Sequence, residues 1–335
     1  MSNEPQTLLE AIKYFADPDV ALATMVELRW PDGVTCPTCG RTDVRFIATR
    51  RIWECKGSHV RKQFTAKRGT IFEDSPLGLD KWFAAIWLIA NCKNGVSSYE
   101  IHRGLGVTQK TGWFMLHRIR LAMETGTFLS SGNSGGSEFE ADETFFGGKA
   151  VNMDKARREK LGKGRGTVGK AVVMGILRRG SDDTASAVKA QHITDTSRKV
   201  LHDAIRANVE PGSAIYTDAL RAYEGLSADY THEVVDHTVE YVRDNVHTNG
   251  LENFWSLFKR TIKGTYVSVV PFHLDAYAVE QTFRFNERKD NDGGRFRKVL
   301  SEVTGKRITY KEVEGTWAHP RCLEGQTPKP RDAER

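Results

Sequence analysis

Apolar positions follow a helical period through the first part of the chain. They recur at helical spacing over residues 6–28 and again over 79–93, where LDKWFAAIWLIANCK predicts a strongly apolar helix. Between these stretches, short apolar runs alternate with turn residues, a pattern typical of short strands. Residues 96–124 then carry two helical patterns separated by GLGVTQ. The pattern therefore predicts a small strand-rich module followed by a helical one.

The period changes after residues 128–137, a Gly/Ser-rich run that predicts a flexible joint. The runs EFEADETFFG, KAVVMGILRR, ASAVKAQHI and SAIYTDAL each have the length and composition of a strand. SRKVLHDAIRANV has a helical pattern and lies between the third and fourth runs. This order predicts a mixed sheet covered by helices. Periodicity is lost from about residue 300, which predicts a loose tail.

Composition narrows the class of protein. The chain has 335 residues and a net charge of +6, so it has room for two or three domains and permits a polyanionic partner without requiring one. Basic residues crowd three segments, 48–69, 155–170 and 284–298, which suit a phosphate backbone or, alternatively, are solvated surface. The chain has no apolar run of the ~18 residues that a membrane span needs, and its start lacks the pattern of a secretory signal. We expect a cytoplasmic protein.

Three of the five cysteines lie close together in the strand-rich segment. Cys36-Pro-Thr-Cys39 is a CxxC turn, and the pair Cys55 and His59 follows after fifteen intervening residues. Two such pairs can close a tetrahedron around Zn²⁺ and hold together strands too short to make a core. The spacing predicts a zinc ribbon in which His59 replaces the usual fourth cysteine. The alternatives are a redox CxxC pair or unliganded thiols.

The two helical patterns of residues 96–124 match a helix-turn-helix, in which the second helix enters the major groove. Ser97 or Ser98 would cap the first helix, with Glu100 placed for a capping box. The candidate DNA-contacting residues at the start of the second helix are Thr108, Gln109 and Lys110. Helical hairpins that never meet DNA are common, and they are the alternative.

The strand EFEADETFFGG is unusually acidic. Alternation places Glu138, Glu140, Asp142 and Thr144 on one face, and Phe139, Ala141, Glu143 and Phe145 on the other. Like charges along a buried strand repel one another and are costly to desolvate, and a divalent cation would remove that problem. An exposed edge strand is the alternative, although the adjoining aromatic residues and AVVMGIL favour a buried one.

Two further carboxylates are candidates for the same site. Asp218 ends the strand SAIYTDAL, where a turn residue is the simpler interpretation. Glu252 begins the amphipathic helix in HTNGLENFWSLFKRTIKG, and Lys259 follows it on the same stripe. Glu252 could instead complete a capping box with Asn249. Two aspartates on neighbouring strands, Asp142 and Asp218, and a glutamate on an adjacent helix could converge on two Mg²⁺ ions.

EADETFFGGK, YTDALRAY and HTNGLENFWSLFKRTIKGTY together resemble the catalytic blocks of bacterial insertion-sequence transposases with an RNase H-like DDE domain. The N-terminal CPTCG…WECKGSHVRKQF and VSSYEIHRGLGVTQKTGWFMLHRIR resemble the ribbon and helices of the zinc-ribbon group related to the eukaryotic Merlin elements. The resemblance implies that Asp142, Asp218 and Glu252 bind metal and that Lys259 takes the E-x6-K position. Asn249 competes with Glu252 for the third position.

The resemblance also implies an activity: binding of terminal inverted repeats, Mg²⁺-dependent strand cleavage and transfer of the 3′-OH to target DNA. Two Mg²⁺ ions, for which Mn²⁺ can substitute, and a structural Zn²⁺ are the expected cofactors. Lys259 and Arg260 would follow the DNA backbone. Double-stranded DNA and further copies of the chain are the expected partners. A non-catalytic DNA-binding regulator and an RNase H-fold nuclease or resolvase are the alternatives.

The fold class expected from all these features is α+β and multidomain. The expected segments are an N-terminal helical segment 1–30, a zinc ribbon 31–75, a helix-turn-helix-like domain 76–127, a linker 128–137, an RNase H-like mixed sheet flanked by helices 138–300, and a tail 301–335.

Overall fold

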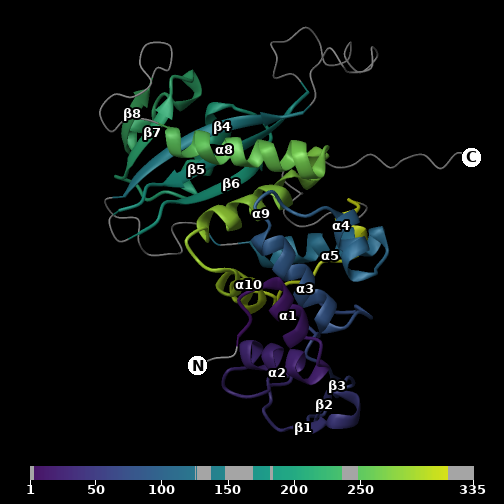
Figure 1. Ribbon diagram of the computed structural model, residues 1–335. Helices are drawn as coiled ribbons and strands as arrows, with labels where there is room; N and C mark the ends of the chain where they lie inside the picture. Colours follow the sequence, from purple (N-terminus) through teal and green to yellow (C-terminus); the bar gives the residue numbers. More distant parts are fainter. Residues whose placement is uncertain are drawn as a thin grey trace, which may run out of the picture. The chain divides into compact units, whose positions relative to one another are not determined.

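The structure is a computed structural model that describes residues 4–124, 126, 137–147, 169–181, 184–235 and 248–315. Its contacts divide the chain into two units (Figure 1). Unit 1 comprises residues 1–123 together with 290–335, and unit 2 comprises 124–289. The expected linker at 128–137, apart from its last residue, lies outside the described residues, as does the chain beyond residue 315. No helix in the described part of the chain has the length and apolar character needed to cross a membrane.

Unit 1 is built mainly from helices. They are α1 Leu8–Tyr14, α2 Pro18–Arg29, α3 Leu79–Asn91, α4 Ser98–Leu105, α5 Gln109–Ala122, α10 Asp292–Ser301 and α11 Tyr310–Val313. The apolar run predicted around 79–93 is the central helix α3, and its Trp82, Phe83 and Trp87 are almost fully buried.

The chain after residue 290 belongs to unit 1, so the boundary predicted at residue 300 lies inside α10. Residues 292–301 belong to unit 1 because an aromatic side chain in α10 packs into its core, a contact that the sequence pattern does not reveal. Phe296 in α10 packs against Phe15, Phe83 and Trp87, with ring centroids 5.3 to 5.8 Å apart. Residues 301–315, expected as part of a loose tail, include α11, which is close to α5.

The predicted strand-rich module is a three-stranded antiparallel sheet in the order β1-β2-β3. Its strands are β1 Val44–Ile47, β2 Ile52–Cys55 and β3 Gln63–Phe64. Four residues are too few to bury much surface, so the module relies on aromatic packing. Trp53 stacks on Phe64 and meets Trp30 edge to face. A metal ion bound by the cysteine and histidine cluster described below would hold these short strands together further.

Helices α4 and α5 form the predicted helical pair. Ser97 caps α4 and forms the predicted capping box with Glu100. The helix ends at Gly106, whose φ of 60° is the left-handed conformation that glycine adopts without strain. Gly112 lets the two helices cross closely, because a Cβ there would lie 2.9 Å from the carbonyl oxygen of Ser98.

Unit 2 contains a five-stranded sheet in the order β6-β5-β4-β7-β8. The strands are β4 Glu138–Phe146, β5 Ala171–Arg178, β6 Ala187–Ile193, β7 Ala214–Asp218 and β8 Thr231–Val235. β4, β5 and β6 pair antiparallel, whereas β4, β7 and β8 pair parallel. This arrangement is consistent with the predicted RNase H-like fold, and the acidic strand β4 is its central strand rather than an exposed edge.

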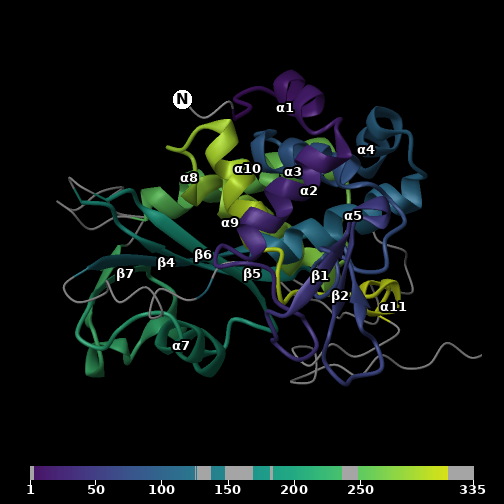
Figure 2. The ribbon, with the colours of Figure 1, turned by 90° about the horizontal axis from the view of Figure 1, so that it is seen from below.

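Helices cover both faces of this sheet (Figure 2). Helix α7 Arg198–Arg206 packs on one face, where Leu201 and Ile205 join Phe139 and Ile215 in a hydrophobic core. Helices α8 Asn249–Thr261 and α9 Leu274–Asn286 lie on the other, where α8 contributes Leu251, Phe254, Trp255 and Phe258 to a second core. The alternation in β4 therefore sends Phe139 and Ala141 towards α7, and Glu140 and Asp142 towards α8.

Candidate active site and zinc centre

The pairing of β4 with β7 brings two of the predicted carboxylates together. The strands run parallel, with Ala141 opposite Thr217, so Asp142 and Asp218 occupy the next position on each strand. Neighbouring strands are about 5 Å apart and equivalent positions project to the same face. Asp218 is the last residue of β7, at the carboxyl end where ligand sites of such sheets are found.

Asp142 lies in an environment that opposes its negative charge. Burial, together with the negative charges of Asp218 and Glu252, raises the pKa of the carboxyl group to about 6. A hydrogen bond from Trp255 Nε1 to Asp142 Oδ2, 2.8 Å long, acts in the opposite direction. Asp142 thus interacts electrostatically with both other predicted ligands, and the three residues come from two strands and one helix. A bound cation would relieve their repulsion.

The first turn of α8 differs from the capping-box interpretation. Asn249 is the first helical residue, Thr248 precedes the helix, and no side chain caps it. The proposed capping box of Asn249 and Glu252 is therefore wrong. Both residues are exposed, and being three positions apart they share one side of the helix. Lys259 and Arg260 lie in the last turn, and His247 lies outside the described residues.

A carboxylate of the sheet takes the place of the missing cap. Glu140 is 1% exposed, and its Oε2 accepts a 3.1 Å hydrogen bond from the Leu251 amide, one of the amides that a helix start leaves without an intrahelical partner. Arg179 Nε donates to the other oxygen, Oε1, at 2.9 Å. Gly250 permits this close approach, because a Cβ there would lie 2.9 Å from Glu140 Oε2.

Glu143 is a further carboxylate near the pair of aspartates, on the opposite face of β4 from Asp142. Burial raises its pKa to about 7, with added repulsion from Asp218 and Asp142. The Tyr223 hydroxyl donates a 2.6 Å hydrogen bond to Glu143 Oε2 and lowers the pKa in part. The sequence pattern placed Glu143 among apolar residues without giving it a role, because nothing in the spacing linked it to Tyr223.

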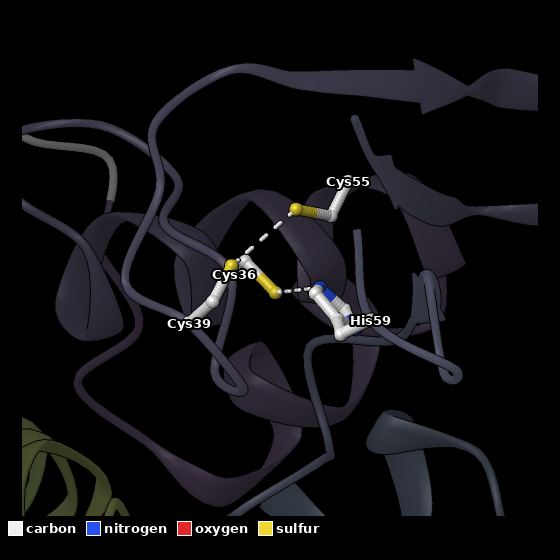
Figure 3. A group of neighbouring side chains, drawn as sticks. All are labelled: Cys36, Cys39, Cys55 and His59. Atoms are coloured by element: carbon white, nitrogen blue, oxygen red, sulfur yellow. Dashed lines mark hydrogen bonds between the residues drawn. The ribbon is translucent and has the colours of Figure 1, made fainter. Parts of the chain in front are cut away.

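The four predicted zinc ligands converge in unit 1 (Figure 3). Cys36, Cys39, Cys55 and His59 each offer an atom, and these atoms all lie within 4.8 Å of one another. Cys39 Sγ and Cys55 Sγ are 3.6 Å apart, and Cys36 Sγ lies 3.4 Å from His59 Nε2. Tetrahedral Zn²⁺ with Zn–S bonds of about 2.3 Å requires thiolates about 3.8 Å apart, so the cluster fits this ion.

The surroundings of Cys36 favour the thiolate form that metal binding needs. Burial raises the pKa of Cys36, but backbone amides of Thr38 and Cys39 and the neighbouring thiols outweigh it, and the pKa falls to about 6. The Gly57 amide donates to Cys55 Sγ at 3.3 Å. In Cys55 the hydrogen bond from Gly57 lowers the pKa of the thiol, but burial and the neighbouring thiols outweigh it, so that the pKa is raised. Amide-to-sulfur contacts of this kind stabilise metal-bound thiolates. Within the described residues, no other group of His, Cys, Asp or Glu is gathered as tightly.

The three candidate DNA-contacting residues lie where α5 begins, and each also has a partner within unit 1. Thr108 caps α5 by accepting from the Thr111 amide. Gln109 Nε2 donates to Ser98 Oγ at 2.9 Å. The ammonium group of Lys110 lies 4.2 Å from the centre of the Tyr310 ring. Thr108 and Lys110 remain exposed.

Two family models match this chain, one in each unit. Residues 134–286 match the ISXO2-like transposase domain, and residues 17–57 match the transposase zinc-ribbon domain. The chain is 28% identical over 261 residues to a Halobacterium salinarum protein named "Uncharacterized protein in transposable element ISH50". The matched residues are 74% of this chain and 84% of that protein.

A shorter match involves a Haemophilus influenzae protein named "Uncharacterized transposase-like protein". The two are 31% identical over 83 residues, which are 24% of this chain and 67% of the relative. Together with the ribbon and the RNase H-like sheet, these matches establish the family. The chain belongs to the insertion-sequence transposases that combine a transposase zinc-ribbon domain with an ISXO2-like transposase domain.

Proposed function

We propose that the protein binds the terminal inverted repeats of its own element, cleaves a DNA strand there with Mg²⁺, and transfers the freed 3′-OH to target DNA. The observation that carries this proposal is the environment of Asp142. This half-buried carboxyl group interacts with the charges of both Asp218 and Glu252, at the carboxyl end of β7 in an RNase H-like sheet. Such an arrangement is unfavourable without a cation and is suited to one.

Asp142 and Asp218 would hold the metal together with Glu252 or Asn249, which share one side of the first turn of α8. Two bound Mg²⁺ ions supply activation of the attacking oxygen and neutralisation of the leaving oxygen in an in-line displacement.

DNA contacts would come from both units. Lys259 and Arg260, in the last turn of α8, would bind phosphates of the DNA backbone. In unit 1, the zinc ribbon and the start of α5 with Thr108, Gln109 and Lys110 would recognise the element ends. Because Gln109 and Lys110 have partners within unit 1, base contacts would require them to exchange these partners for DNA.

The test is cleavage of the element's end DNA by the full chain. Asp142→Asn and Asp218→Asn should abolish cleavage and leave end binding unchanged, since both substitutions preserve shape and remove charge. Asp203→Asn, an exposed carboxylate on α7 over the opposite face, is the control and should cut normally. Normal cleavage by either of the first two variants would overturn the role of that residue.

The same assay decides the third ligand. Loss of cleavage in Glu252→Gln but not in Asn249→Ala assigns Glu252, and the reverse assigns Asn249. End binding by the wild-type chain without metal-dependent cutting would favour the DNA-binding regulator. Cutting without joining of pre-cleaved 3′-OH ends would favour the nuclease or resolvase.

A further inference from the structure

Trp255 contacts the predicted metal ligand Asp142 in a way that depends on a glycine in the next strand. Asp142 in β4 pairs directly with Gly175 in β5. The indole of Trp255 lies over Gly175 so closely that a Cβ there would meet two of its ring atoms at 2.7 and 2.8 Å. From this position Nε1 reaches Asp142 Oδ2.

This contact is more specific than core packing requires. Trp255 is 4% exposed and belongs to the hydrophobic core under α8, so burial of its ring alone would stabilise the unit. An indole has one donor, however, and that donor usually finds a partner when buried. Here the partner is one oxygen of the carboxyl group that faces Asp218 and Glu252. Together with a hydrogen bond from the Glu143 backbone amide, this hydrogen bond restrains the rotation of that carboxyl group, and it leaves Oδ1 as the oxygen that Trp255 does not contact.

We infer that Trp255 is a positioning residue for metal binding: its indole N–H orients the Asp142 carboxylate so that Oδ1 faces the cation, and Gly175 provides the space that the indole needs. This inference rests on the proposed function, because it assumes that Asp142 binds metal. Hydrogen bonds from outside the ligand set orient carboxylate ligands in this way, and their loss typically weakens metal affinity or activity 10- to 100-fold.

The first variant is Trp255→Phe, which keeps an aromatic ring in the core and removes the N–H. We expect about a tenfold increase in the Mg²⁺ concentration that gives half-maximal cleavage of end DNA, with unchanged end binding. A purely structural loss would lower the amount of active enzyme and hence the maximal rate, without moving that concentration. Trp82→Phe is the matched control, because Trp82 is equally buried and its Nε1 donates to Ser75 Oγ at 3.1 Å in unit 1.

The second variant is Gly175→Ala, which retains the indole N–H group of Trp255 but pushes the ring away from Asp142. It should raise the required Mg²⁺ concentration at least as much as Trp255→Phe does. A phenyl ring does not extend to the two indole atoms that the new Cβ would meet, although Leu251 Cδ2, 2.9 Å from that Cβ, remains in both backgrounds. The double variant should therefore exceed Trp255→Phe by much less than the effect of Gly175→Ala alone, whereas independent roles would make the two effects multiply.

The outcomes separate this inference from the proposed function. If Asp142→Asn abolishes cleavage while Trp255→Phe has the metal dependence of the wild type, the inference fails and the proposed function stands. If Asp142→Asn cuts normally, the role of Asp142 as a metal ligand is overturned and this inference fails with it. Direct titration of Mn²⁺ onto the zinc-loaded chain without DNA, followed by electron paramagnetic resonance, should show the same weakening in Trp255→Phe.

Discussion

Glu140→Gln should loosen the start of α8 and thereby the whole candidate site. The substitution keeps the size of the side chain and removes its charge. Glu140 uses both oxygens, one for the Leu251 amide and one for Arg179 Nε. A glutamine has one oxygen, so its NH₂ group must face one of these two donors. Arg179 also donates to Glu138 and stacks on Tyr216, so it is not left without a partner.

The magnitude follows from these contacts. Breaking a buried ion pair costs about 3–5 kcal/mol when the remaining charge has no partner, and a hydrogen bond to a charged group contributes about 1.5–3 kcal/mol. Because Arg179 keeps its contact with Glu138, we expect an effect near the lower ends of these ranges. The free energy of local opening of α8 should decrease by about 2–3 kcal/mol. Each 1.4 kcal/mol is about tenfold, so exchange of its first amides should become about 30- to 100-fold faster.

Hydrogen–deuterium exchange of peptides that cover 249–261 measures this directly. Glu138→Gln is the control, because Glu138 contacts the same arginine but its side chain is 41% exposed. This substitution should change the exchange rate of the same peptides by less than about fivefold. Strand cleavage should fall in Glu140→Gln, because α8 carries Glu252 and Trp255. Equal exchange rates in the two variants would refute the idea that Glu140 holds the start of α8.

Two further predictions concern zinc and pH. Purified protein should contain about one Zn²⁺, which Cys39→Ser loses and His59→Cys retains; less than half an equivalent in the wild type, measured by mass spectrometry, would contradict the assignment. The folded protein holds the proton of Asp142 more tightly than the unfolded chain does. The free energy of unfolding of Mg²⁺-free, zinc-loaded protein should therefore decrease by about 3 kcal/mol through this group as the pH rises from about 3 to 7, with the steepest loss between about pH 4 and 6. Asp142→Asn should remove that contribution, so an unchanged pH dependence of the melting temperature would contradict the burial argument.

Much of the architecture could be predicted from residue patterns. The spacing of Cys36, Cys39, Cys55 and His59 predicted a cluster that the structure forms. Alternation in EFEADETFFG predicted which residues of β4 share a face, and the aromatic neighbours favoured a buried strand. Local spacing failed where distant packing decides the outcome. Phe296 packs against residues some two hundred positions earlier, so the loss of periodicity near residue 300 concealed a helix of unit 1.

The roles of Glu140 and Asp142 show why the candidate site could not be resolved from sequence. Both acids lie on the same face of β4, two residues apart, and the pattern treats them alike. In the structure, Arg179 and the Leu251 amide satisfy the two oxygens of Glu140. Asp142 receives a hydrogen bond from Trp255 and faces the negative charges of Asp218 and Glu252. A buried carboxylate with cationic and amide partners stabilises the fold, whereas the charge of one that faces other carboxylates is unfavourable and would be stabilised by a bound cation. The distinction depends on the strand register and the position of α8, neither of which local spacing determines.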